Sequence, residues 1–222
     1  MTTRLPGYAP CALRLPPVAH TVLPLLLAAL LAGAAVSGFE PAITPRLIDE
    51  ALGIGESRID AVRTRFHQPY RLQVGRPPID YVDVVTPYRR VVLLTEERTR
   101  LGIRGFTQRE ATAALGNQSG VVELRVEMTF HQQNAFVGVP DYGVELVAAS
   151  PPTRLMPSNL ERIPRFGARL NTTGGGGSPL VGGTIVATFP IAGLNGTGAY
   201  EVVVSEKGKE LGRARVNFAG LK

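Results

Sequence analysis

Residues 122–130 of this 222-residue chain read VELRVEMTF, and apolar and polar side chains alternate along the whole stretch. Val122, Leu124 and Val126 fall on one side, with Glu123 and Arg125 between them. Because successive side chains of a strand point to opposite faces, this pattern predicts a half-buried strand with one apolar and one wet face.

The same period returns further along the chain. It recurs at 142–148, at 185–191 and at 200–204, and the last segment leads through Glu206–Lys209 into a second alternating run that ends at Phe218. Such a pair of runs around a short turn is typical of a hairpin. Several alternating strands with turn signals between them predict an antiparallel β-sandwich over residues 119–222.

One short motif in this half resembles a known family. Gly198-Ala199-Tyr200-Glu201-Val202 follows a strand and a Leu194-Asn195-Gly196 turn, and it resembles the tyrosine corner of immunoglobulin-like sandwiches. The resemblance implies that the Tyr200 hydroxyl bonds back to nearby backbone. The chain departs from antibody domains because it has no tryptophan and lacks the two sheet-bridging cysteines. The resemblance therefore concerns architecture and implies no activity.

Residues 38–118 carry mixed signals with a helical tendency. Thr44-Pro45 predicts a helix start, with Leu47, Ile48, Ala51 and Leu52 on one face and a stop at Gly53 or Gly55. Ser57 predicts a second cap, before a face of Ile59, Val62 and Phe66. Thr107–Glu110 matches a capping box, and Gly116 closes the helix that follows.

Other segments of this part favour strands. Residues 70–74 and 79–85 predict short strands on either side of Gly75-Arg76-Pro77-Pro78. Between 86 and 101 the run Val91–Leu94 favours a strand whereas Glu96-Glu97-Arg98 favours a helix, and we expect a helix there. The fold class predicted for the whole chain is α+β, with a mixed helical part over 38–118 packed on the sandwich of 119–222.

Residues 1–37 have the order of a secretory signal peptide. Arg4 and Arg14 come first, an apolar run from Val22 to Ala32 follows, and small residues lead to Ser37. We expect export, cleavage near Ser37 and a periplasmic or extracellular location. The alternative is an uncleaved anchor, although the run is shorter than the roughly 20 residues of a membrane helix.

Cleavage would remove the single cysteine, Cys11, together with His20. It would also remove two of the 24 basic residues and none of the 18 acidic ones, so the formal charge would fall from +6 to +4. Thiol catalysis, thiolate metal sites and disulfides are then excluded. No cofactor and no metal site are predicted.

His67 and His131 are the remaining candidates for a catalytic base. His131 is expected on the polar face of its strand, in water, and His67 at a helix C-terminus, where the dipole favours it. Asp80 and Asp83 are the acids closest to a catalytic or calcium role, but three residues apart on a strand they point to opposite faces. Glu96 and Glu97 are interpreted as a solvated helix face.

From Arg58 to Arg109 the chain has eleven arginines against five acids. This excess predicts a basic interaction surface that would attract an acidic partner or an anionic surface. Its candidate residues are Arg63, Arg65, Arg71, Arg89, Arg90, Arg98 and Arg100.

Taken together, these features favour an exported, non-enzymatic interaction or assembly module of a bacterial envelope. Its expected partners are an envelope protein or an anionic surface, not nucleic acid, with membrane contact only through an uncleaved leader. The alternative hypothesis is an envelope hydrolase that uses His67 with a nearby carboxylate such as Asp80 or Asp83.

Overall fold

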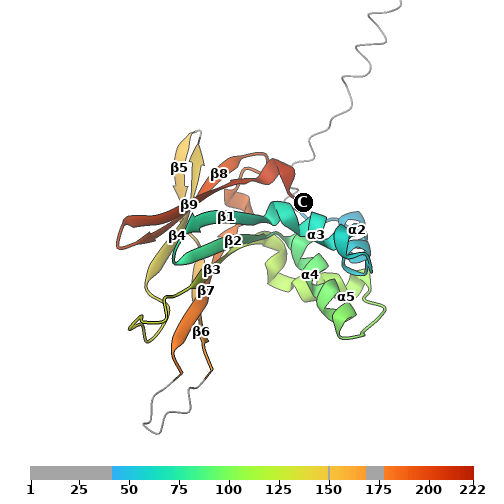
Figure 1. Ribbon diagram of the computed structural model, residues 1–222. Helices are drawn as coiled ribbons and strands as arrows, with labels where there is room; N and C mark the ends of the chain where they lie inside the picture. The colour runs from blue at the N-terminus through green and yellow to red at the C-terminus, as the bar shows by residue number, and fades with distance from the viewer. Residues whose placement is uncertain (1–41, 150, 169–177) are drawn as a thin grey trace, which may run out of the picture. The chain divides into compact units, whose positions relative to one another are not determined.

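The computed structural model describes residues 42–149, 151–168 and 178–222, which belong to one compact unit (Figure 1). The predicted signal peptide lies outside the described residues. Among the helices in the described ranges, none combines the length and the apolar character of a membrane span. The described α-helices are α2 (Pro45–Gly55), α3 (Asp60–His67), α4 (Pro87–Arg100) and α5 (Gln108–Leu115).

The strands form two antiparallel sheets, which makes the fold α+β. One sheet has the order β1-β2-β3-β7-β6 and the other the order β5-β4-β8-β9. The strands are β1 (Arg71–Arg76), β2 (Ile79–Val85), β3 (Val121–Thr129), β4 (Tyr142–Ala149), β5 (Pro152–Leu155), β6 (Asn159–Phe166), β7 (Leu180–Pro190), β8 (Ala199–Glu206) and β9 (Lys209–Asn217).

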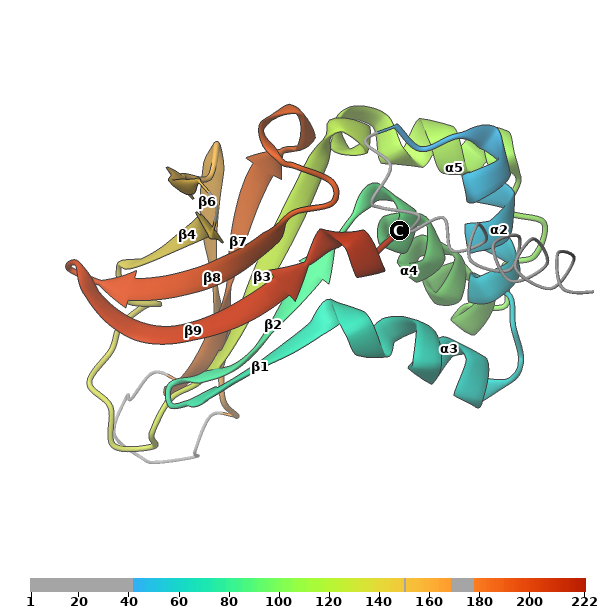
Figure 2. The same ribbon diagram turned by 90° about the horizontal axis from the view of Figure 1, so that it is seen from above.

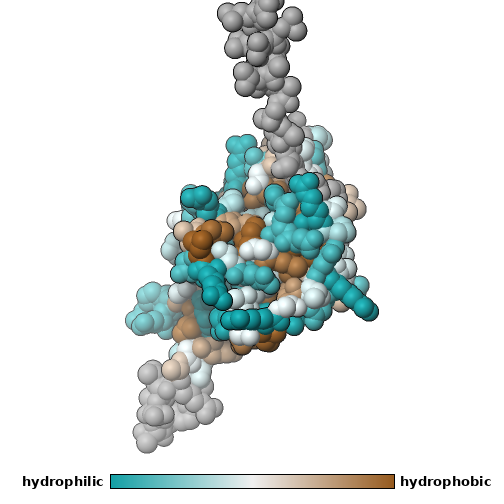
Figure 3. All heavy atoms as spheres, turned by 90° about the vertical axis from the view of Figure 1, so that its right-hand side faces the viewer, coloured by the Kyte–Doolittle hydropathy of each residue, from teal (hydrophilic) through white to brown (hydrophobic). Residues whose placement is uncertain are grey.

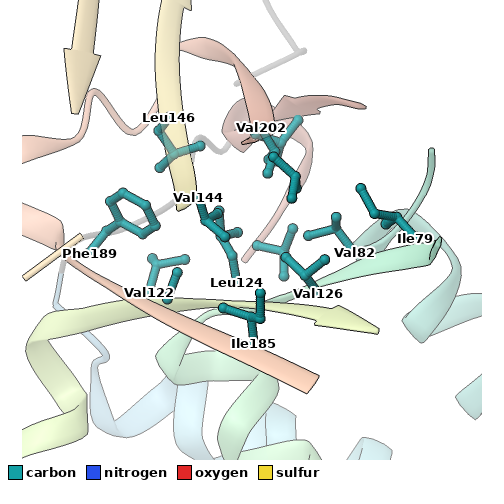
Figure 4. Packing of buried hydrophobic residues seen from close by; sticks show 14 of the residues in the cluster. Ile79, Val82, Val122, Leu124, Val126, Val144, Leu146, Ile185, Phe189 and Val202 are labelled. Atoms are coloured by element: carbon teal, nitrogen blue, oxygen red, sulfur yellow. The ribbon is translucent and has the colours of Figure 1, made fainter. Parts of the chain in front are cut away.

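The alternating residues of the sequence form the main core. Leu124 and Ile185 from one sheet and Leu146 and Val202 from the other point toward one another (Figure 4). Phe189 on β7 packs into the same cluster. This packing of two inner faces is compatible with a β-sandwich and confirms the antiparallel strands predicted after residue 118.

Two features of the sheets differ from what the sequence analysis expected. β1 and β2 pair with each other and β2 pairs with β3, so the five-stranded sheet takes strands from both sides of residue 118. β5 and β6 were not predicted. β6 lies at a sheet edge, paired only with β7, and most of its side chains are exposed, so it lacks the apolar face that alternation would reveal.

The helices form a second, smaller core beside the sheets. Thr44, Thr86 and Thr107 each cap a helix through the side chain, and Thr107 forms the predicted capping box with Glu110. Residues 87–100 are helical, as expected. α2 approaches α4 closely at Gly55, where an added Cβ would lie 2.5 Å from the Cβ of Thr95.

α3 corrects one prediction. Ser57 does not cap this helix, because the helix begins at Asp60 after Ile59, which provides no side-chain cap. The Ser57 hydroxyl instead accepts a hydrogen bond from the Ile59 amide at 3.3 Å. Ile59 and Val62 are exposed, and only Phe66 of the expected apolar face packs against the cores.

The C-terminal segment joins the helices to the sheets (Figure 2). The Lys222 carbonyl accepts hydrogen bonds from the Tyr70 hydroxyl at 3.2 Å and from the Thr86 hydroxyl at 2.5 Å. Its Nζ lies 2.9 Å from a carboxylate oxygen of Glu50 on α2. Leu221 is buried next to these contacts, so this segment links the turn before β1, α2 and the start of α4.

Tyr88, whose ring centroid lies 5.6 Å from Nζ of Lys222, makes the stability of the protein sensitive to high pH. Burial, with the nearby charge of Glu50, raises the pKa of its phenol to about 12. An unfolded tyrosine titrates near 10, so the stabilisation is complete below about pH 10 and is lost as the pH rises through about 12. We expect Tyr88 to contribute about 2–3 kcal/mol to the fall in the free energy of unfolding across this window, and Tyr88→Phe to remove that contribution. Urea unfolding on the two sides of the window measures both; an equal fall in the variant would contradict the assignment.

Tyr200 makes the contact that its motif implied. The Asn195 amide donates a hydrogen bond to the Tyr200 hydroxyl at 2.7 Å, and the ring packs edge-on against Phe218. Tyr200→Phe should lower the free energy of unfolding by about 1–2 kcal/mol, because the Asn195 amide loses its acceptor. Chemical denaturation tests this against Tyr81→Phe, which removes a hydroxyl that makes no hydrogen bond within the described ranges. Equal losses in the two variants would contradict a role for the Asn195 bond.

Candidate functional site

A cleft of about 1000 Å³ lies where α3, α4 and the β1–β2 hairpin meet. Its wall from α3 is made of residues spaced three and four apart, which places them on one face of that helix. The lining residues are Asp60, Arg63, Thr64, His67, Gln68, Arg71, Gln73, Asp83, Arg89, Leu93 and Glu96.

His67 is the last residue of α3, as predicted, and both of its ring nitrogens are engaged. Its Nε2 lies 2.9 Å and 3.0 Å from the two carboxylate oxygens of Glu96. Its Nδ1 accepts a hydrogen bond from Nε of Arg89 at 3.3 Å. Because a nitrogen that accepts carries no proton, this geometry assigns the proton of a neutral ring to Nε2, which donates to Glu96.

Arg89 is the most deeply buried charged side chain of the cleft, with 3% of its surface exposed. Besides its bond to His67, it donates to the Val84 carbonyl at 2.7 Å and lies 3.4 Å from a carboxylate oxygen of Asp83. Burial lowers the pKa of the guanidinium, and the charge of Asp83 opposes that shift. A buried charge of this kind persists because it is paired and hydrogen-bonded.

Arg71 completes this series of hydrogen bonds and ion pairs at the outer rim. It donates from Nε and from a terminal nitrogen to the two carboxylate oxygens of Asp83, at 3.3 Å and 3.4 Å. Its guanidinium lies 4.1 Å from the ring centroid of Tyr81. The hydrogen bond to Asp83 raises the pKa of Arg71. Together these contacts form a continuous series across the cleft, in the order Glu96–His67–Arg89–Asp83–Arg71.

This arrangement limits the chemistry that His67 can perform. A general base needs one ring nitrogen free to take a proton from a nucleophile, while an acid orients the other. Glu96 fits the orienting role, but Arg89 occupies the nitrogen at which a nucleophile would lie. No hydroxyl is bonded to His67 in the described residues, nor do three metal-ligating side chains come together there.

The carboxylate partner of His67 is Glu96, not Asp80 or Asp83. The sequence analysis interpreted Glu96 as part of a solvated helix face, and the structure corrects that interpretation. Asp80 lies elsewhere and accepts a hydrogen bond from the Thr129 hydroxyl at 2.8 Å. No local signal marks Glu96, because its pairing arises only when α4 packs beside α3, 29 residues away in sequence.

His131 lies away from this site. β3 ends at Thr129, so His131 belongs to the turn that follows and not to the polar face of the strand. It is exposed, and its Nδ1 accepts a hydrogen bond from the Gln133 amide at 3.2 Å. This contact closes the turn.

The predicted basic residues are distributed among several local contacts. Arg89 is buried, Arg98 stacks 4.4 Å from the ring centroid of Phe106, and Arg65 is exposed without an ion pair in the described residues. The remaining four each lie beside an acid: Arg63 by Asp60, Arg71 by Asp83, Arg90 by Glu123 and Arg100 by Glu97.

Comparisons of the chain with protein-family models, with curated proteins and with solved structures found no match. Its function is therefore argued from its own residues and contacts.

Proposed function

We propose that this chain is an exported, non-enzymatic interaction or assembly module of a bacterial envelope. The observation that carries the proposal is the double engagement of His67 by Glu96 and Arg89. The histidine that lines the cleft serves there as a hydrogen-bonding link between α3 and α4, and its ring has no nitrogen free for proton transfer.

We further propose that the sandwich is immunoglobulin-like. The strand orders β2-β3-β7-β6 and β5-β4-β8-β9 correspond to A-B-E-D and C′-C-F-G of that family, with β1 as an added strand. Tyr200 stands at the start of β8, the counterpart of strand F, where the tyrosine corner belongs. This architecture commonly presents binding surfaces, but it identifies no partner by itself.

The proposed location follows from residues 1–37, whose charge, apolar run and small residues are those of a signal peptide. The proposed partners are an envelope protein or an anionic surface. N-terminal sequencing of the protein recovered from the periplasm tests the location: a mature start at Gly38 supports it, and an intact Met1 in the cytoplasm contradicts it.

In-cell photo-crosslinking tests the interaction role. A tag placed directly after Ser37 avoids the Lys222 contacts, and crosslinking residues replace exposed side chains such as Arg65 and Val137. We expect the same partner in repeated captures, and also from a His67→Gln variant that is still folded. Recovery of no reproducible partner from any exposed position would contradict the proposal.

One observation favours the alternative, a hydrolase. His67 lies in a cleft of about 1000 Å³ with a carboxylate at hydrogen-bonding distance, as a catalytic histidine would. This alternative requires Arg89 to move away from Nδ1. It predicts that purified protein hydrolyses ester or glycoside substrates and that His67→Gln abolishes the activity without unfolding the chain. No hydrolysis above that of the variant would reject it.

A further inference from the structure

The helical part of the chain has an end that faces away from both sheets. α3 leads through a single 3-10 turn, Gln68–Tyr70, into β1, whereas α4 starts directly after β2. His67 at the end of α3 contacts Arg89 and Glu96, so the two helices lie side by side near the sheets. The start of α3 and the end of α4 must then both lie at the far end of the helices (Figure 2).

Large apolar side chains are exposed at this far end. Ile59, just before α3, is 63% exposed, and Leu101, just after α4, is 59% exposed. Val62 and Ile103, close by in sequence, are exposed as well. Figure 3 views the molecule from the helical side and shows apolar patches among hydrophilic side chains.

Unpaired cations accompany these apolar side chains. Arg58 and Arg104 are exposed at this end and make no ion pair in the described residues, and Arg65, in the last turn of α3, is exposed and unpaired on the outer face of that helix. On α3, Val62 and Arg65 are three residues apart and share a face, which is opposite to the face that lines the cleft.

The acids of this region do not neutralise them. Asp60 and Glu97 pair with other arginines, and Glu110 is engaged in the capping box. Glu56 is the exposed acid here without a partner in the described residues. The unpaired arginines therefore outnumber the free acid, which leaves the far end and the outer face of α3 with excess positive charge.

We propose that this far end of the helices and the adjoining outer face of α3, with their four apolar side chains and unpaired arginines, bind the surface of an anionic phospholipid bilayer. The apolar side chains would enter the boundary between headgroups and acyl chains, and the arginines would meet lipid phosphates. The inference rests on the proposed interaction module and names its partner. It differs from the sequence expectation, which allowed membrane contact only through an uncleaved leader.

The character of the side chains favours a bilayer over an acidic protein. The four apolar residues are aliphatic, and binding hot spots between proteins are enriched in aromatic side chains seated in pockets. A fluid bilayer requires no matching shape, and arginines can reach the phosphates while their stems stay beside the apolar side chains.

Vesicle flotation tests the proposal. Purified chain starting at Gly38 contains every described element and both cores, and circular dichroism verifies its fold. The vesicles are pure phosphatidylcholine or phosphatidylcholine mixed with phosphatidylglycerol. We expect binding to the anionic vesicles only, weakening as salt rises, since surface attraction is screened beyond about 10 Å at 0.1 M salt.

Three variants locate the contact. Arg65→Gln with Arg104→Gln should lower the partition coefficient about 30-fold, because each arginine near an anionic surface contributes roughly a factor of five. Ile59→Ser with Leu101→Ser should also lower it. Val137→Ser is the matched control: Val137 is 96% exposed but lies in the loop after β3, at the end of the sheet away from the helices, and its replacement should change nothing.

Two results would overturn the inference. One is equal binding to neutral and anionic vesicles. The other is an equal loss of binding with Val137→Ser. If vesicles do not bind but the same arginine and apolar variants lose a crosslinked protein partner, the bilayer is rejected while the interaction module stands. If both assays find nothing, the proposed function fails as well.

Discussion

Replacing Arg89 with methionine is expected to lower the free energy of unfolding by about 3–5 kcal/mol, the usual loss when one member of a buried ion pair is removed. Methionine fills much of the space but donates no hydrogen bond. The Val84 carbonyl and Nδ1 of His67 would lose their donor, and Asp83 would keep only Arg71 at the rim. Urea unfolding at neutral pH measures the loss.

Arg65→Met is the matched control for this prediction. Arg65 lies on the neighbouring helix, is exposed and makes no ion pair in the described part of the chain, so its replacement should change stability by less than about 0.5 kcal/mol. Asp83→Asn in the Arg89→Met background should restore part of the loss, because it removes a carboxylate that only the half-exposed Arg71 still balances. Equal effects of Arg89→Met and Arg65→Met would contradict the network described for the cleft.

Phe189→Ala is expected to lower the free energy of unfolding by about 3–5 kcal/mol, since a buried phenylalanine leaves a cavity that the surrounding core fills only partly. Phe189 is fully buried and packs between the two sheets (Figure 4). In a domain of this size the loss corresponds to a fall in Tm of about 10 °C. Calorimetry measures it directly.

Phe136→Ala removes the same side chain from a different place. Phe136 is partly exposed in the loop after β3 and contacts only the edge of Phe130 among the aromatic rings of the described residues. Phe136→Ala should lower the free energy of unfolding by well under half of the loss expected for Phe189→Ala. Comparable losses would contradict a main core held between the two sheets.

The sequence predicted well those strands and helices whose buried face shows as a regular spacing of apolar residues within the element itself. β3 and β7 alternate because one of their faces lies in the core, and β2 spans the residues expected for it. α4 has a strand-like run at Val91–Leu94, but the Thr86 cap and Pro87 start a helix, and the buried apolar side chains lie on its inner face.

The two strands that the sequence did not predict, β5 and β6, are formed by pairing with a neighbouring strand. β6 contains charged residues and Pro164, and it is a strand because it pairs with β7 along its whole length. β5 is short and pairs only with β4. Neither strand has an apolar face of its own, so no period in the sequence marks it.

The contacts in the cleft around His67 could also not be predicted from the sequence alone. The sequence pointed to His67 at a helix end and to Asp83 as one candidate for its acid partner, but the two side chains are joined only through a third residue. Their connection is Arg89, a residue assigned to the exposed basic surface that is in fact buried. Its position follows from the packing of α4 on the sheet, which a count of charges along the chain does not contain.

The bonds of Lys222 carry a consequence for the order in which the molecule folds. Lys222 is separated in the chain from Tyr70 by 152 positions and from Thr86 by 136 positions. β1 and β9, which are also far apart in the chain, lie in contact as well. Contacts over such separations require large loops to close first, which slows folding relative to chains dominated by local contacts. The helices and the β1–β2 hairpin can therefore form early, whereas their contacts with β9 and Lys222 form only after the final strand is in place.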